Sequence, residues 1–141
     1  MNSKVLIATL AAAVAVFLFG WVVFGILLAD FYKANAPVYE GLMKDPPDLL
    51  MIFLSNIFNA FLIAYIFNRW AGIRTAGEGA QAGFVIMAIV ALGTNLMMYA
   101  TTNLTTPILM AVDVVGSGFF GAVIGAVAGY VLGTGKKAAA V

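Results

Sequence analysis

Four long apolar runs, separated by short polar segments, set the pattern of this chain. They cover residues 5–29, 49–68, 80–100 and 107–133, and the only charged residue inside them is Asp113. A helix that rises about 1.5 Å per residue needs about 20 residues to cross a hydrocarbon core about 30 Å thick, and every run has that length. None shows the alternation of a membrane β-strand. The pattern predicts an all-α integral membrane protein, a single domain built as a four-transmembrane-helix bundle.

The segments between the runs carry signals that begin helices. Asp48 is the expected N-cap of the second helix, and Thr75 with Glu78 has the spacing of a capping box before the third. Thr106 and Pro107 are expected as N-cap and first residue of the fourth helix. In the longest connection, the segment 37–44 predicts a short helix lying at the membrane interface.

The first run also has the outline of a secretory signal peptide, because Lys4 precedes an apolar stretch. A signal peptide has an apolar region of only about 7–15 residues, followed by a small-residue cleavage site. The run 5–29 is longer than that, and no such site lies at a suitable distance before Asp30. We therefore interpret the run as a retained transmembrane helix.

The composition agrees with a membrane protein and argues against several functions. Hydrophobic residues make up 64% of the chain and charged residues 9%, against roughly 45–50% and about 25% in soluble domains. The absence of cysteine and histidine removes thiol chemistry and the commonest general base and metal ligand. A formal net charge of +1 gives no field that attracts nucleic acid. We expect no enzymatic activity, no cofactor, no metal site and no nucleic-acid partner.

The placement of lysine and arginine predicts the orientation. With the N-terminus inside, the cytoplasmic set is Lys4, Arg69, Arg74, Lys136 and Lys137, and the outer set is only Lys33 and Lys44. The opposite orientation would put the larger set outside, against the positive-inside rule. Both ends of the chain are therefore expected in the cytoplasm.

Polar side chains in the outer halves of the helices are the candidates for a binding site. They are Asn56, Asn59, Asn95, Tyr99, Asn103 and Asp113. Asp113 is a functional candidate because an acid inside a membrane is costly. It also lies only about six residues, or about two helical turns, from the outer helix end, where headgroups and water would bathe it.

These polar residues allow two interpretations. One is a crevice open to the outside that receives a small solute or a cation. The other, which we favour, is hydrogen bonding between helices, with each bond contributing on the order of 1 kcal/mol.

The fourth run carries a small residue at every fourth position, namely Ser117, Gly121, Gly125, Gly129 and Gly133. Small residues let membrane helices approach closely, and close packing is what joins helices in lipid. The partner is either another helix of the bundle, which we favour, or a second copy of the chain.

The short connection 101–106 makes the third and fourth helices antiparallel neighbours, so residues at equal depth should face one another. The predicted pairs are Gly79 with Gly129, Gly83 with Gly125, Met87 with Gly121, Ala91 with Ser117, and Asn95 with Asp113.

Four segments of the chain resemble a known family. Residues 19–33, 64–70, 95–104 and 112–115 are similar to the four helices of small bacterial inner-membrane proteins grouped as a domain of unknown function. The resemblance covers most of the chain. It implies a four-helix bundle in a bacterial inner membrane, and it implies no activity, because none is assigned to that family.

Two functions remain open from the sequence. The first, which we favour, is a structural or accessory membrane protein that packs with itself, with lipid or with a larger membrane complex. It is motivated by the glycine stripe and by the low content of charge. The alternative is a small channel or carrier whose polar crevice opens to the outer side.

Overall fold

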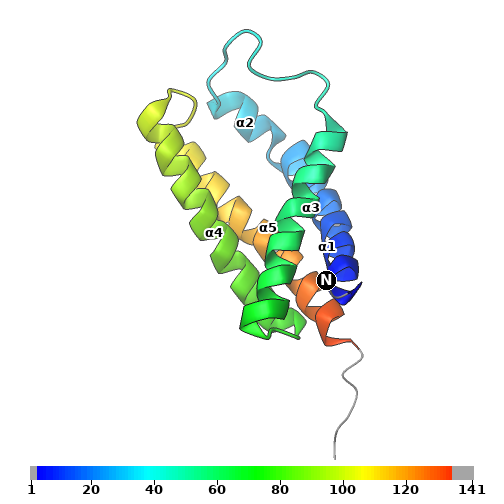
Figure 1. Cartoon of the computed structure of the whole chain (residues 1–141). Coiled ribbons are helices and arrows are strands. Elements are labelled where there is room, and N and C mark those ends of the chain that lie inside the picture. The colour runs from blue at the N-terminus through cyan, green and yellow to red at the C-terminus, as the bar shows by residue number, and fades with distance from the viewer. Residues whose placement is uncertain (1–2, 135–141) are drawn as a thin grey trace, which may run out of the picture.

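The computed structural model describes residues 3–134, and every regular element in that range is a helix. In chain order the elements are α1 (Ser3–Val22), η1 (Val23–Leu27), α2 (Ala29–Asn35), α3 (Leu49–Ile66), η2 (Phe67–Ala71), α4 (Ala76–Thr101) and α5 (Pro107–Gly133). α1 with η1, α3 with η2, α4 and α5 form four helices long and apolar enough to cross a membrane (Figure 1). The prediction of four such helices is confirmed.

Three of the long helices begin at the capping residues that the sequence predicts. Asp48 accepts a hydrogen bond from the first turn of α3 at 3.1 Å, and Thr106 accepts one from the first turn of α5 at 3.4 Å. Before α4, the Glu78 N–H donates to Thr75 Oγ1 at 3.3 Å, and this hydroxyl donates to Glu78 Oε2 at 2.9 Å. Each cap satisfies an N–H group that a helix start leaves free. α4 therefore begins at Ala76 rather than at residue 80, because the capping box and not the hydropathy sets its start.

The first two spans end in π-helical turns. At the end of η1 the Leu28 N–H donates to the carbonyl oxygen of Val23 at 2.8 Å. Leu28 then leaves helical geometry, with φ −102° and ψ 0°, and α2 starts directly after it. η2 ends at Gly72, whose φ of 67° lies in the left-handed region that favours glycine.

The short helix predicted over residues 37–44 is wrong. That stretch consists of turns and extended backbone, and the short helix of this connection is α2. Ala36 is extended, with φ −75° and ψ 140°. This is the conformation that a proline imposes on the residue before it, so Pro37 ends the helix. Gly41 then turns the chain at φ 74°.

The four long helices form two groups, a hairpin of α4 and α5 and a pair of α1 and α3. α4 and α5 run antiparallel along each other, and α1 packs against both α3 and α5 (Figure 1). Within residues 3–134, α5 is the only helix that makes an extended contact with α4. α4 is thus held on one side alone.

The buried core lies in the half of the bundle that holds the N-terminus, which we call the closed end. Its residues are mostly small or medium in size: Val5, Ala8, Ala12, Ala13, Val16, Ala60, Ile63, Ala64, Phe67, Ile124, Ala128 and Leu132. They come from α1, α3, η2 and α5, and none comes from α4. The alanines allow these helices to approach closely.

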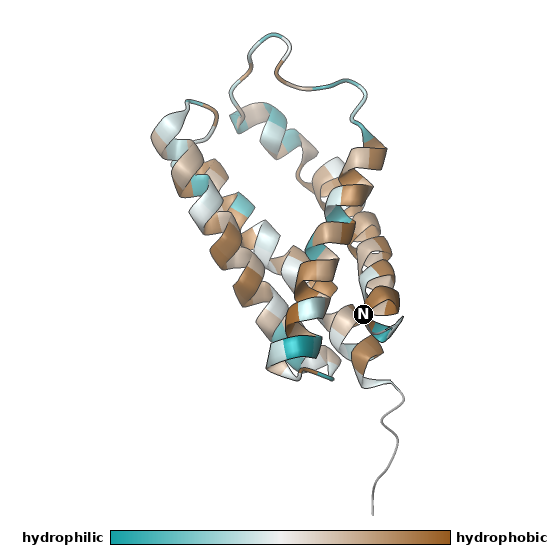
Figure 2. Cartoon of the chain, in the orientation of Figure 1, coloured by the Kyte–Doolittle hydropathy of each residue, from teal (hydrophilic) through white to brown (hydrophobic). Residues whose placement is uncertain are grey.

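The opposite half, which we call the open end, is loosely packed. Every residue of the segments 38–52 and 96–104 is exposed, so the first turn of α3 and the last turn of α4 are uncovered on all sides. Figure 2 shows apolar residues along all four long helices, including the parts near this end. The bundle is therefore closed at one end and splayed at the other.

The lysine and arginine residues form two groups, one at each end of the bundle. Lys4, Arg69 and Arg74 lie at the closed end, and Lys33 and Lys44 belong to the connection at the open end. Lys136 and Lys137, which complete the predicted cytoplasmic set, lie outside the described residues.

Candidate functional site

The contact between α4 and α5 is made by backbone atoms that glycines leave uncovered. A Cβ atom added at Gly83 would overlap the carbonyl oxygen of Gly121, and one added at Gly79 would overlap that of Gly125. The reverse also holds, because a Cβ at Gly121 would overlap the carbonyl oxygen of Gly83. The glycine stripe of α5 therefore packs within the bundle, as the sequence analysis favoured.

The observed register of α4 against α5 is the predicted one. Gly83 faces Gly125, since a Cβ built on either glycine would come 3.1 Å from the Cα atom of the other. Gly79 faces Gly129 in the same way, at 3.4 Å, so both predicted glycine pairs are confirmed. Met87 meets Gly121 as predicted, with its Cβ atom 2.7 Å from a Cβ built there. Small side chains on one helix fit between those on the other, as ridges fit into grooves.

The two ends of the glycine stripe of α5 have different contacts. At the closed end, Gly129 packs on the carbonyl oxygen of Thr75 and Gly133 on that of Arg74, so both glycines contact the turn before α4. Toward the open end, Ser117 is partly exposed, and its neighbour Gly118 receives the ring of Phe84.

Asn95 and Asp113 form the polar centre of this contact. The Nδ2 atom of Asn95 donates to Oδ2 of Asp113 at 2.6 Å and to the carbonyl oxygen of Ala91 at 2.9 Å. Asn95 is buried, with 9% of its surface exposed, and Asp113 is partly buried. The predicted meeting of these two residues is confirmed. Their hydrogen bond joins the two helices near the open end, where the glycine contact has ended.

Tyr32 on α2 is near enough to Asp113 for the carboxylate to affect its phenol. Its ring lies 5.8 Å from the ring of Phe24 and 5.8 Å from that of Phe31, measured between centroids. Burial, together with the nearby Asp113 carboxylate, raises the pKa of the Tyr32 phenol above its ordinary value. The hydroxyl is therefore protonated at neutral pH. The sequence analysis does not place Tyr32 in the site, because hydropathy gives no signal for the turn at Leu28 that redirects α2.

The other predicted site residues lie elsewhere. Asn56 on α3 is buried, with 7% of its surface exposed, and Asn59 is partly buried. Tyr99 is exposed on the last turns of α4, and Asn103 lies in the connection between α4 and α5. Of the six predicted residues, Asn95 and Asp113 are the two that a hydrogen bond joins within residues 3–134.

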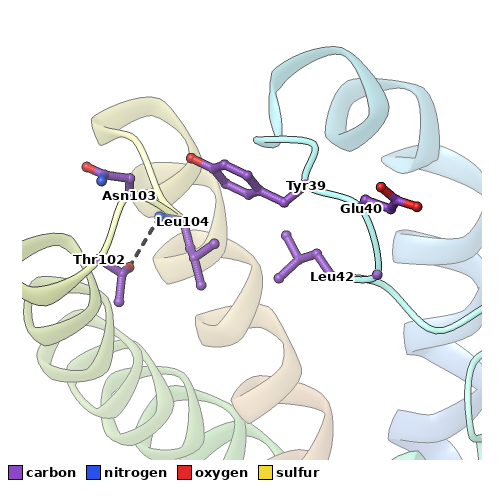
Figure 3. A pocket seen from close by; sticks show the side chains of 7 residues that line it. Tyr39, Glu40, Leu42, Thr102, Asn103 and Leu104 are labelled. Atoms are coloured by element: carbon purple, nitrogen blue, oxygen red, sulfur yellow. Dashed lines mark hydrogen bonds between the residues drawn. The ribbon is translucent and has the colours of Figure 1, made fainter.

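Asn103 lines a cavity of about 500 Å³ at the open end. Its walls come from two connections, and the lining residues are Tyr39, Glu40, Gly41, Leu42, Thr102, Asn103 and Leu104. Figure 3 shows the Tyr39 side chain extending across the gap toward Asn103 and Leu104. The Thr102 hydroxyl accepts a hydrogen bond from the Leu104 N–H at 3.2 Å, which holds this side of the cavity in a tight turn.

A second cavity, of about 480 Å³, lies between the first span and α5. Its lining is almost wholly apolar and includes Phe19, Val23, Leu27, Val112, Val115 and Phe119. Neither cavity is lined by Asn95, Tyr32 or Asp113.

Among residues 3–134, no group of three or more aspartate, glutamate, histidine or cysteine side chains is placed to hold a metal ion. Comparison of the chain with family models, with curated proteins and with solved structures finds no match.

Proposed function

We propose that this protein is a structural or accessory component of a bacterial inner membrane, with both ends in the cytoplasm, and that it acts by packing against another membrane component. The closed end then faces the cytoplasm and the open end faces outward, which follows the positive-inside rule. The proposal includes no catalytic role, since the chain has no cysteine and no histidine.

The observation that carries this proposal is the one-sided packing of α4. Val85, Ile89, Leu92 and Leu96 recur at helical spacing on the face of α4 opposite the glycine contact. Each is exposed, with Ile89 at 64% and Val85 at 54%. This face, which we call the α4 outer face, extends over residues 85–96 of the 26-residue helix α4. It is the surface against which the helix of a second copy, of a larger complex or the surrounding lipid would pack.

The chain lends itself to a direct test, because it has no native cysteine. A single cysteine replacing Ile89 on the α4 outer face is coupled in membranes to a photoreactive maleimide. We expect one crosslinked product of discrete higher mass, which mass spectrometry then identifies as a second copy or as another protein. The matched control is Ile7→Cys on α1, where the native side chain is 58% exposed and lies outside the α4 outer face. Equal products at both positions, or none at position 89, would argue against the proposal.

A second function, that of a small channel or carrier open to the outer side, is favoured by one observation. The Asn95–Asp113 pair places an acid and an amide inside two of the membrane-spanning helices. Intramembrane acids mark solute and ion pathways in many membrane proteins. Reconstitution into vesicles tests this candidate, because a carrier predicts solute or cation flux that Asp113→Asn abolishes. A wild-type protein that leaves flux at the level of empty vesicles rules the carrier out for the solutes tried.

A further inference from the structure

The apolar cavity between the first span and α5 is a groove that opens to the surroundings of the bundle. Leu27, Val115 and Phe119 line it, and each of these side chains is more than half exposed. The lining is almost wholly apolar, so the volume of about 480 Å³ offers little that could hold water or a polar solute by hydrogen bonds. We call this cavity the apolar groove.

The apolar groove runs along the helices and occupies only the half of the bundle nearest to the open end. Its lining comes from residues 19–28 of the first span and from residues 111–119 of α5, which run in opposite directions. Because a helix rises about 1.5 Å per residue, these two segments make the groove about 12–13 Å long. Next to its deep end, Val16 and Ile124 are buried in the core, so the groove stops near the middle of the spans.

Aromatic rings fill the space between the two spans at the same height as the groove. A Cβ atom added at Gly20 would come 2.6 Å from the ring of Phe120, and one added at Gly116 would come 3.3 Å from the ring of Phe24. The rings of Phe24 and Phe120 lie 5.3 Å apart between centroids. The two spans are therefore in contact along the groove, and the groove is a hollow on the surface of the bundle.

The π-helical turn η1 contributes to this hollow, since Val23 and Leu27 of η1 both line it. π-helical turns within longer helices are rare and occur often at functional sites. The groove thus coincides with the least regular part of the first span.

We propose that the apolar groove binds one acyl chain of a phospholipid from the leaflet at the open end. Each leaflet contributes about half of a hydrocarbon core about 30 Å thick, which matches both the length of the groove and its place in one half of the spans. A helix of another protein is about 10–12 Å wide and would lie along the whole core rather than along one half of it. The inference rests on the membrane location proposed above, but not on the partner of the α4 outer face.

Thermal unfolding of the purified full chain tests the proposal. The protein is kept in a steroid-based detergent, which has no alkyl chain to occupy the groove, and is titrated with dioleoylphosphatidylglycerol. We expect the melting temperature to rise by about 3–6 °C and then to level off, as a ligand that binds only the folded state requires. Dihexanoylphosphatidylglycerol has the same headgroup and much shorter chains, and it should give no comparable rise.

A side chain that fills the groove should replace the lipid chain. Val115→Phe adds a ring inside the groove, and we expect it to reduce the lipid-dependent rise to less than half of that in the wild type. Val90→Phe is the matched control on α4. Its native valine is 49% exposed, compared with 52% for Val115, and it lies outside the groove. This control should keep the full rise.

A second pair of variants keeps the test decisive if Val115→Phe does not fold. Ala111→Leu enlarges an exposed residue at the outer end of the groove and should also reduce the rise, whereas Ala100→Leu, at an exposed alanine of α4, should not. A wild-type protein without a saturable rise overturns the proposal. So does an equal rise with the short-chain lipid, or a rise that Ala111→Leu retains in full. None of these outcomes bears on the crosslink at position 89, so the two proposals fail separately.

Discussion

The Nδ2 atom of Asn95 lies 2.6 Å from Oδ2 of Asp113, which ties α4 to α5 beyond the end of their glycine contact. A hydrogen bond to a carboxylate is short and strong compared with one between neutral groups. The same nitrogen also donates to the carbonyl oxygen of Ala91, so both N–H groups of the amide are used. The pair therefore holds α4 and α5 together at the open end of the hairpin that they form.

Loss of the Asn95 donor should weaken this link between α4 and α5. Asn95→Leu leaves Asp113 partly buried without its hydrogen bond, and we expect a loss of about 1–3 kcal/mol in the free energy of unfolding. Asp113→Asn keeps an acceptor in the same place and should be milder than Asp113→Leu. Thermal unfolding in detergent measures the differences. The matched control, Tyr99→Phe, alters an exposed residue one turn away and should change little. An Asn95→Leu protein as stable as the wild type would show that the pair does not hold the helices.

The glycine contact makes a sharper prediction, because the chain contains its own control. Gly83→Ala places a Cβ against the backbone carbonyl of Gly121, where no side chain can move aside. We expect the hairpin to separate or the protein to lose several kcal/mol of stability, on the order of an overpacked core. Gly93→Ala, on the same helix, meets nothing within 4 Å. It should stabilise α4 slightly, by about 0.5–1 kcal/mol, because alanine favours helix over glycine.

Melting temperature and a crosslink between α4 and α5 report on both variants. A Gly83→Ala protein that matches Gly93→Ala in both measurements would contradict the backbone contact.

The orientation is testable with single cysteines in intact cells. We expect a membrane-impermeant maleimide to label a cysteine at position 44, in the open-end connection, and not one at position 74. Both positions should label after the membrane is permeabilised, which controls for reactivity. Labelling of position 74 alone in intact cells would reverse the orientation proposed from lysine and arginine placement.

The pH dependence of stability should report on Tyr32. Burial and the Asp113 carboxylate raise the pKa of this phenol in the folded protein, so the folded state holds the proton more tightly than the unfolded chain. The corresponding stability is present below the ordinary tyrosine pKa of about 10 and is lost as the pH rises through the raised value. Between about pH 9 and about pH 11 the melting temperature of the wild type should fall more steeply than that of Tyr32→Phe. Tyr39→Phe, at an exposed site, should follow the wild type. Parallel curves for all three proteins would place Tyr32 away from Asp113.

The sequence predicts two kinds of feature in this protein. One depends on residues that are close in the chain, and the other on which residues of two antiparallel helices lie at the same height. The caps at Asp48, Thr75 and Thr106 begin three of the long helices, because each cap involves only a few neighbouring residues. The meeting of Asn95 with Asp113 follows from the short connection between α4 and α5. This connection fixes the height of each residue of one helix relative to the other to within about one helical turn.

What the sequence does not predict depends on contacts between distant segments. Counting from the connection gives the glycine pairs but not how closely the two backbones approach, because that distance depends on the crossing of the two helices. The position of Tyr32 depends on the break at Leu28, where a π-turn ends the first span without any proline or glycine at that residue. Asn56 and Asn59 lie on a helix that has no extended contact with α4, so their polarity alone says nothing about which site they join.

The one-sided packing of α4 also has a consequence for how the bundle is assembled. α4 is synthesised before α5, yet α5 is the helix on which it packs. Residues of α5 likewise complete the core that α1 and α3 begin, through Ile124, Ala128 and Leu132. α1 and α3 have each other as partners before α5 is made, whereas α4 finds its principal contact only when α5 follows it. α5 therefore completes both halves of the structure.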